Sequence, residues 1–215
     1  MESRTFTDEI AYERGHVLTY EAVKGEHHTW NGPECECCGA TRVNPFTDVP
    51  ESDFYFEAAL WALDKGITTG VTEDTFAPNR DVTRAEVVTF LWRAAGSPVV
   101  EGTNPFTDIA ETDFYYNAVL WAVANGITTG KTETTFAPLA TCTRAETVTF
   151  LWRGAGKPEV TGTENFADVN EGDFFQSAVI WAVEKGITNG IDANNFGSYN
   201  ICNRAHIVTF MYRGQ

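Results

Sequence analysis

Three arginines, Arg84, Arg144 and Arg204, recur every 60 residues, and each is the second residue of a short motif. The motif is Thr-Arg-Ala-Glu in the first two copies and Asn-Arg-Ala-His in the third. A guanidinium presents paired donors that match the paired oxygens of a carboxylate. Threonine and asparagine cap helix N-termini, where the first backbone amides attract anions. The motif therefore predicts recognition of a carboxylate-bearing ligand at three equivalent places.

A structural function is the alternative for the same motif. Thr83 and Glu86 fit a capping box, as do their counterparts 60 residues later. In the third copy His206 replaces the glutamate, yet Arg204 remains, although a cation near a helix N-terminus is mildly unfavourable. This retention favours a second function for the arginine, although the diverged surroundings make Arg204 a weaker candidate than the other two. The competing explanation is an ion pair that locks adjacent repeats, for which the candidate partners are Asp48, Asp108 and Asp168.

A second group of reactive side chains lies near the N-terminus. Cys35 and Cys38 have the C-x-x-C spacing of half a zinc site, and His27 could supply a third ligand. A disulfide involving these cysteines and Cys37, or a reduced linker, is the alternative. The further candidate ligands are His16 and His28.

The composition excludes several classes of partner. The formal net charge of -15 disfavours nucleic acid and anionic membrane surfaces, because both repel an acidic protein. No segment approaches the roughly 20 apolar residues of a membrane helix, and no signal peptide is visible.

The sequence contains no nucleophile–base–acid set and no phosphate-binding loop. We therefore expect no enzymatic activity, and no cofactor apart from the zinc just considered.

The elements that must position the arginines follow from an internal repeat. Phe46-Thr47-Asp48-Val49 recurs twice more, each time after 60 residues, and many other residues keep the same register. Such a period indicates a repeat architecture. The expected division is a non-repeat segment at 1–42, followed by repeats at 43–102, 103–162 and 163–215.

Each repeat reads as helix, loop and helix. In the first repeat, Asp53 is placed to cap a helix whose apolar face includes Ala58 and Trp61, and Gly66 ends it. A second helix starts at the arginine motif. Because one helix pair cannot bury its own apolar face, we expect an all-α fold in which three helix-loop-helix units share a core around a pseudo-threefold axis. An open solenoid is the alternative.

Further residues have two interpretations each. Glycines at 60-residue spacing in the loops fit tight turns with positive φ, but they also permit close approach of a ligand; these are Gly70, Gly130 and Gly190. Trp61 and Trp121 could stack on sugars, although their helical spacing favours the core. Cys142 and Cys202 replace Val82 in their repeats and are predicted to be buried free thiols.

The ordered motifs F-x-D-V, W-A-x-x-x-G-I-T-x-G, T-F-x-P and T-R-A-E resemble the S-layer homology family over residues 43–215. The resemblance implies a pseudo-trimeric helical anchor on secreted bacterial surface proteins. It also implies non-covalent binding of secondary cell-wall polysaccharides, often ones with a ketal-linked pyruvate, in grooves between repeats. The arginine of T-R-A-E is implied as a central contact.

The resemblance therefore implies a location at the bacterial cell surface and a cell-wall polysaccharide as partner. The glycan candidates are Arg84, Arg144, Arg204, Gly70, Gly130, Gly190, Asp48, Asp108, Asp168, Trp61 and Trp121. We expect one or two working grooves, because the third repeat has Gly197-Ser198 where the other two repeats have Ala-Pro. The alternative function is a protein–protein module for surface-layer self-assembly. An anchor needs the arginine exposed in a groove, whereas an assembly scaffold would bury it.

Overall fold

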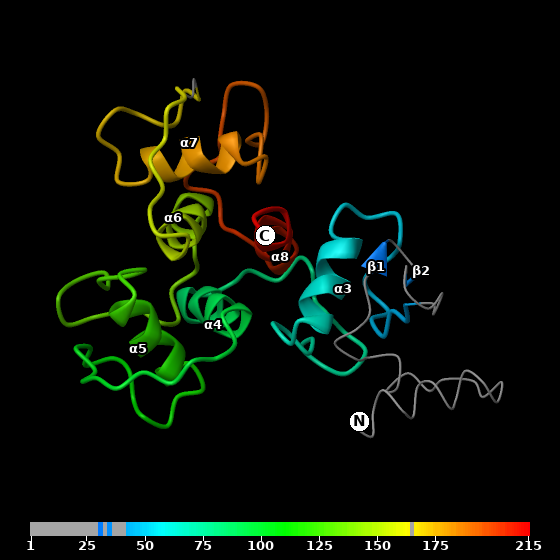
Figure 1. Ribbon diagram of the computed structural model, residues 1–215, viewed down its shortest axis with the longest axis horizontal. Helices are drawn as coiled ribbons and strands as arrows, with labels where there is room; N and C mark the ends of the chain where they lie inside the picture. Colours follow the sequence, from blue (N-terminus) through cyan, green and yellow to red (C-terminus); the bar gives the residue numbers. More distant parts are fainter. Residues whose placement is uncertain (1–29, 32–33, 36–41, 164–165) are drawn as a thin grey trace, which may run out of the picture. The chain divides into compact units, whose positions relative to one another are not determined.

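The computed structural model describes residues 30–31, 34–35, 42–163 and 166–215. The chain divides into two compact units, Met1–Pro45 and Phe46–Gln215. In the first unit, strand β1 (Trp30–Asn31) pairs antiparallel with strand β2 (Glu34–Cys35). The second unit contains the repeats and is helical, as the sequence predicts (Figure 1).

Each repeat contributes two helices to the second unit. The first helices of the three repeats are α3 (Phe56–Asp64), α5 (Tyr116–Ala124) and α7 (Gln176–Glu184). The second helices are α4 (Arg84–Ala94), α6 (Arg144–Gly154) and α8 (Arg204–Arg213). No helix in the described part of the chain has the length and apolarity of a membrane span.

The first helices begin later than the sequence suggests. The expectation that Asp53 caps α3 is wrong, because the N-cap is Tyr55, which makes no side-chain capping bond. The carboxylate of Asp53 instead accepts a 2.5 Å hydrogen bond from the Tyr55 hydroxyl. In the next repeat, Asp113 accepts a bond from the backbone N–H of Ala110. These aspartates stabilise the turn that precedes each helix.

Helix α3 ends at Asp64, and Gly66 just past its end has a φ of +68°, as the sequence predicts. The backbone N–H of Gly66 donates to Leu63, and that of Ile67 donates to Ala62. This pair of bonds is a Schellman motif, and it needs the left-handed residue that glycine supplies without strain. The second helices begin as predicted, with complete capping boxes at Thr83 and Thr143.

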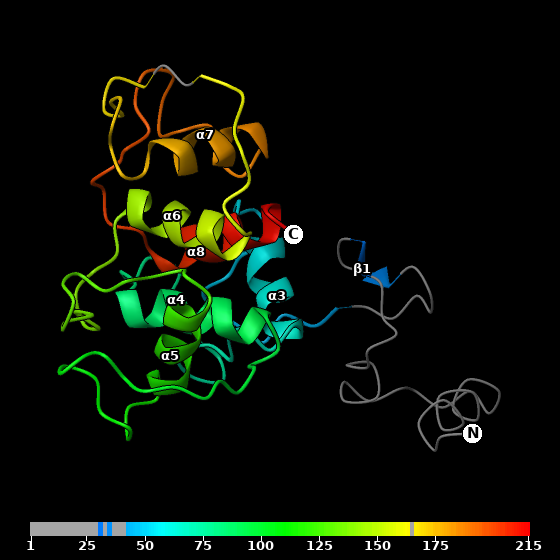
Figure 2. The ribbon, with the colours of Figure 1, turned by 60° about the vertical axis from the view of Figure 1, so that its left-hand side comes forward.

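The helices pack in a closed cycle. Each second helix packs against the first helix of the following repeat: α4 against α5, α6 against α7, and α8 against α3. The second helices also contact one another, and Figures 1 and 2 show them side by side at the centre of the unit, with the first helices outside. One buried hydrophobic cluster runs through all three repeats. The predicted pseudo-threefold arrangement is therefore confirmed, and the open solenoid is excluded by the contact between α8 and α3.

The three repeats meet in a small triangle of backbone hydrogen bonds. The N–H of Val82 donates to Cys202, that of Cys202 donates to Cys142, and that of Cys142 donates to Val82, at 3.0, 2.8 and 2.9 Å. The side chains of all three residues are fully buried, and both cysteines are free thiols, as the sequence predicts. Burial raises the pKa of Cys142 to about 12 and that of Cys202 to about 11.

The loop glycines generate a stability prediction. Gly130 has a φ of +87°, and a Cβ there would lie 2.5 Å from a Phe106 ring carbon and 2.5 Å from the Thr132 carbonyl oxygen. We expect Gly130→Ala to lower the free energy of unfolding by about 2–3 kcal/mol, because it adds this clash to the left-handed backbone strain. Thermal and urea unfolding followed by circular dichroism would measure the loss.

The matched control is Gly126→Ala. Gly126 has a φ of +66°, but a Cβ there would meet nothing within 4 Å. Its loss should therefore be smaller, about 1 kcal/mol, from backbone strain alone. Equal losses for the two variants would contradict the close packing at Gly130.

Candidate functional site

The three motif arginines are the first residues of the central helices, and each reaches across to the next repeat. Arg84, Arg144 and Arg204 are only 3%, 4% and 3% exposed. Each guanidinium carbon lies over two phenylalanine rings of the following repeat, one from its loop and one from its second helix. The distances from Arg84 are 5.0 Å to Phe136 and 5.2 Å to Phe150; from Arg144, 5.1 Å to Phe196 and 5.1 Å to Phe210; from Arg204, 4.7 Å to Phe76 and 5.4 Å to Phe90.

A backbone carbonyl fixes each guanidinium in this position. The Nε of Arg204 donates to the carbonyl oxygen of Phe76 at 2.7 Å, and the other two arginines make the same bond to Phe136 and Phe196 at 3.1 Å. One of the two aromatic rings and the carbonyl come from the same residue of the loop. The phenylalanine of each loop is therefore part of the arginine site and does more than pin the loop to the core.

The motif aspartates hold this loop in place. Asp48 accepts hydrogen bonds from the backbone N–H groups of Phe76 and Ala77 at 2.8 and 2.7 Å, and Asp108 binds the equivalent amides of its repeat. Ala77 has a φ of +58°, which is strained for a residue with a Cβ. The carboxylate stabilises this strained turn and so orients the carbonyl of Phe76 toward the arginine. Asp48 is thus connected to Arg204 through the loop backbone.

Asp168 makes the same contacts and one more. It accepts bonds from the backbone N–H groups of Phe196, Gly197 and Ser198. Burial alone would raise the pKa of Asp168, but the hydrogen bonds from Ser198 and Phe196 outweigh that effect and lower it. Asp168 is therefore ionised throughout the neutral range.

The amides at the start of the central helices are already used. The N–H groups of Arg144 and Ala145 donate to the carbonyl oxygens of Asn200 and Ser198 at 2.9 and 3.1 Å, and the other two repeats make equivalent bonds. The expectation that these amides are available to an anion is therefore wrong. The loop of the next repeat occupies them, so any anion must be bound by side chains.

The interface between repeats 1 and 2 contains its own carboxylate. The Nη1 of Arg84 lies 3.1 Å from the Oε1 of Glu146, and Lys131 also forms an ion pair with Glu146. Burial would raise the pKa of Glu146, but the bond from Lys131 and the charge of Arg84 help to lower it. The cation of Arg84 is therefore compensated within the protein.

At the interface between repeats 2 and 3, the buried guanidinium of Arg144 forms no ion pair with any described residue. Arg144 donates its Nη2 to the hydroxyl of Thr188 at 3.3 Å. Among the described residues, no carboxylate lies within 4 Å of Arg144, and its Nη1 has no hydrogen-bond partner. Burial lowers the pKa of Arg144. His206 and Ile191 occupy the positions that Glu146 and Lys131 fill at the first interface.

The interface between repeats 3 and 1 is intermediate. Arg204 donates its Nη2 to Thr68 at 3.1 Å, and within the described chain it too has no carboxylate within 4 Å. Burial, with the positive charge of Arg80, lowers the pKa of Arg204 to about 10. Glu86 lies nearby, but its ion pair is with Arg80. The site remains positively charged at neutral pH.

The structure brings most of the sequence candidates together. The N–H of Gly70 donates to the hydroxyl of Thr68, which also accepts from Arg204, so arginine, threonine and glycine meet at this interface. Gly190 and Thr188 are arranged in the same way beside Arg144. The two tryptophan candidates are half-buried on the outer helices. Trp61 packs on Tyr212, near the C-terminal end of α8, and Trp121 occupies the equivalent position on α5.

Sequence reasoning missed one feature of these interfaces. Phe54 is 61% exposed and stacks on His206, with ring centroids 5.9 Å apart. The positive charge of Arg144 helps to lower the pKa of His206, so these two side chains lie near each other. Phe54 of the first repeat therefore borders the interface between the second and third repeats. The signal was visible, because exposed phenylalanines recur every 60 residues, at positions 54, 114 and 174.

The side chains of the proposed zinc ligands lie outside what the structure describes. His27 and Cys38 belong to segments that the structure does not describe, and only the backbone of Cys35 is described, in β2. Within the described segments no group of three potential ligands could hold a metal ion. The zinc site therefore stays a prediction from the sequence.

Comparison with known proteins identifies the repeats. The sequence profile of the S-layer homology domain matches residues 45–88, 105–148 and 165–205. The chain belongs to the S-layer homology domain family. Each matched segment runs from the aspartate loop through the first helix to the start of the second. In this S-layer homology unit the match thus covers the three arginines, the aspartates and the loop phenylalanines, while the second-helix rings of Phe90, Phe150 and Phe210 lie just beyond it.

Several relatives are surface proteins by name. The chain is 29% identical over 75% of its length to the Surface-layer 125 kDa protein of Lysinibacillus sphaericus. The aligned region covers 14% of that protein. The chain is 26% identical over 64% of its length to the Cellulosome-anchoring protein of Acetivibrio thermocellus, covering 32% of that protein. An Endoglucanase of Bacillus sp. (strain KSM-635) is 32% identical over 47% of the chain and 11% of the enzyme. The chain thus spans less than a third of each of these relatives.

The third repeat generates a second stability prediction. Asn203 caps α8 by accepting from the backbone N–H of His206, but there is no glutamate to complete the box. We expect His206→Glu to raise the free energy of unfolding by about 1 kcal/mol, because glutamate completes the box and supplies Arg144 with a carboxylate. Denaturant unfolding at neutral pH would measure the gain; a loss of stability would contradict it.

The same variant tests a pH dependence. Burial and the charge of Arg144 lower the pKa of His206 below its ordinary 6.5. As pH falls, His206 takes up its proton in the unfolded chain before it does so in the folded protein. The contribution of neutral His206 to the free energy of unfolding is therefore complete above pH 6.5, and it is lost as pH falls through the folded pKa. The melting temperature of the unmodified protein should therefore fall further than that of His206→Glu between about pH 7.5 and about pH 5.5. Parallel curves would contradict this assignment.

Proposed function

We propose that the three-repeat unit is a non-enzymatic anchor that holds a secreted protein at the bacterial cell surface by binding an anionic cell-wall polysaccharide. The observation that carries this proposal is the buried cation of Arg144, which has no carboxylate within 4 Å in the described chain. Burying an unpaired charge is costly unless another group compensates it. A carboxylate of the ligand, such as that of a pyruvate ketal, would compensate Arg144 as Glu146 compensates Arg84.

The three interfaces differ in their capacity for such a ligand. At the first, Glu146 already occupies the position beside Arg84. At the second and third, Arg144 and Arg204 each keep one Nη nitrogen without a partner among the described residues. We therefore assign the main glycan site to the interface of repeats 2 and 3, and a second site to that of repeats 3 and 1. This ordering differs from the sequence expectation, which favoured Arg84 over Arg204.

Neighbouring groups would contact the sugar around this carboxylate. Phe54 offers an exposed aromatic face at the rim, on which the C–H face of a sugar can pack. The hydroxyl of Thr188 is within hydrogen-bonding distance of Arg144 and borders Gly190. The aspartates and Gly130 contribute indirectly, since they hold the loops that position the arginines. Trp61 and Trp121 contribute to the core of the outer helices.

The variant His206→Glu provides a sharp test, because it fills the anion position without creating a cavity. We expect it to weaken binding of purified cell-wall polysaccharide by roughly tenfold or more, since Arg144 would then be paired internally. Calorimetry would compare polysaccharide from the source organism before and after mild acid removal of pyruvate. Removing pyruvate should weaken binding of the unmodified protein in the same way.

The matched control is Glu146→Gln. It removes the carboxylate of the first interface and leaves Arg144 untouched, so polysaccharide binding should be retained. Undiminished binding by His206→Glu would exclude Arg144 as the anion contact. No binding of the unmodified chain to any wall fraction would exclude the anchoring function itself.

Self-association in a surface layer is the second candidate, and two observations favour it. The arginines are buried, which is the outcome expected of an assembly scaffold. Phe54, Phe114 and Phe174 expose 61%, 68% and 61% of their surface in equivalent places, as a contact surface for other copies would. Analytical ultracentrifugation would decide: concentration-dependent assembly that Phe114→Ser abolishes would support this candidate, and a monomer at all concentrations would exclude it.

A further inference from the structure

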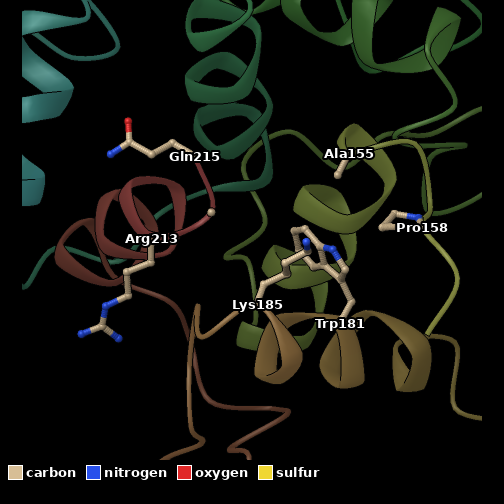
Figure 3. A pocket seen from close by; sticks show the side chains of 7 residues that line it. Ala155, Pro158, Trp181, Lys185, Arg213 and Gln215 are labelled. Atoms are coloured by element: carbon tan, nitrogen blue, oxygen red, sulfur yellow. The ribbon is translucent and has the colours of Figure 1, made fainter. Parts of the chain in front are cut away.

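A cavity of about 360 Å³ lies at the opposite end of the central helices from the arginine motifs. It is formed where the C-terminal ends of α6 and α8 meet the outer helix α7 (Figure 3). Its lining residues are Ala155, Pro158, Trp181, Lys185, Arg213, Gly214 and Gln215. The cavity also lies between repeats 2 and 3, but none of these residues contacts Arg144 or belongs to the arginine site described above.

The wall of this cavity contains a hydrogen-bond donor without a partner. Trp181 is only 6% exposed, yet its indole Nε1 has no hydrogen-bond partner in the described chain. A buried N–H without a partner is costly, because it has lost its bond to water. Figure 3 shows Trp181 and Lys185 extending from α7 toward Ala155 and Pro158 across the cavity. An acceptor atom of a ligand would satisfy this donor.

Lys185 supplies positive charge beside the indole. Within the part of the chain that the structure describes, Lys185 has no carboxylate within 4 Å, although the protein carries a net charge of -15. Arg213 also lines the cavity, but its Nη1 donates to the carbonyl oxygen of Ile187, and Figure 3 shows its guanidinium pointing away from Trp181. The amine of Lys185 is therefore the cation available to a ligand.

The equivalent place in the second repeat lacks this charge. Asn125 stands where Lys185 stands in the third, and its side-chain amide donates to the carbonyl oxygen of Trp121 at 2.8 Å. In the first repeat, Lys65 stands at the position of Lys185, and Trp61 also has an indole nitrogen without a partner in the described residues, but Tyr212 packs on its ring. In the third repeat, the cavity, the indole N–H without a partner and the amine of Lys185 thus occur together.

We propose that this cavity is a second binding site, which accepts a single sugar-sized ring bearing a carboxylate or a phosphate. The indole N–H donates to a ligand oxygen, and Lys185 pairs with the anionic group. The apolar faces of Trp181, Pro158 and Ala155 receive the C–H face of the ring. The volume lies in the range of pockets that hold one small molecule. A bare inorganic ion would leave these apolar walls without contacts.

The indole resonance of Trp181 gives a direct measurement. In the ¹⁵N-labelled full chain, the Nε1–H signal of Trp181 is assigned by its disappearance in Trp181→Phe. Glucuronate and glucose 6-phosphate are then titrated separately, with glucose as the neutral control. We expect a saturable downfield shift of the Trp181 signal with at least one of the two anions, and the one that binds more tightly identifies the anionic group. Lys185→Met should weaken that binding roughly fivefold or more.

Matched variants separate this site from other effects. Asn125→Ala should leave the titration of the Trp181 signal unchanged. The indole signal of Trp121 should not shift when either anion is added. His206→Glu should also leave it unchanged, so failure of the polysaccharide site and failure of this site are distinguishable. The proposal is overturned if neither anion gives a saturable shift, if glucose shifts the signal equally, or if Lys185→Met binds as the unmodified protein does.

Discussion

Each boundary between repeats is held by a guanidinium that lies between two phenylalanine rings and donates to a backbone carbonyl of the next repeat. A desolvated cation over an aromatic face contributes up to about 2 kcal/mol. The planar guanidinium can satisfy the carbonyl and both rings at once, which an ammonium cannot. The aspartate loop, its strained turn and the caps of the central helices all serve to position these three partners.

The sequence predicted those elements whose cause is local. The capping boxes and the left-handed glycines depend on residues within a few positions of one another, and they were confirmed. The start of the first helices was predicted wrongly. Asp53 has the chemistry of a cap, but it bonds to the Tyr55 hydroxyl instead, a choice that depends on how the turn packs.

The environment of the arginines could not be predicted in the same way. Which carboxylate approaches Arg84 depends on how two repeats dock, because Glu146 is 62 residues away in the sequence. The burial of the guanidinium, and the use of the helix amides by loop carbonyls, also arise only in the assembled ring. The substitution of His206 for glutamate was visible in the sequence, but its consequence for Arg144 follows from the packing of repeats 2 and 3.

The pseudo-symmetry allows the three interfaces to differ in charge while sharing one geometry. Two positions account for much of the difference: Glu146 corresponds to Glu86 and His206, and Lys131 corresponds to Val71 and Ile191. Neither position alters the rings or the carbonyl that hold the arginine. A single substitution can therefore change an interface from one whose arginine is paired with a carboxylate of the protein to one whose arginine can bind an external anion. The residues that hold the arginine stay the same.

The packing of α8 against α3 closes the cycle. In the triangle of backbone bonds, the N–H and the carbonyl oxygen of Val82, Cys142 and Cys202 are all paired with one another. An open array can lengthen one unit at a time, but a closed ring cannot, because a fourth unit would find no free partner. Growth of such a protein would have to proceed by adding whole rings. For the same reason the three units are topologically interchangeable: a permuted chain that began at the second unit and ended with the first would contain the same contacts.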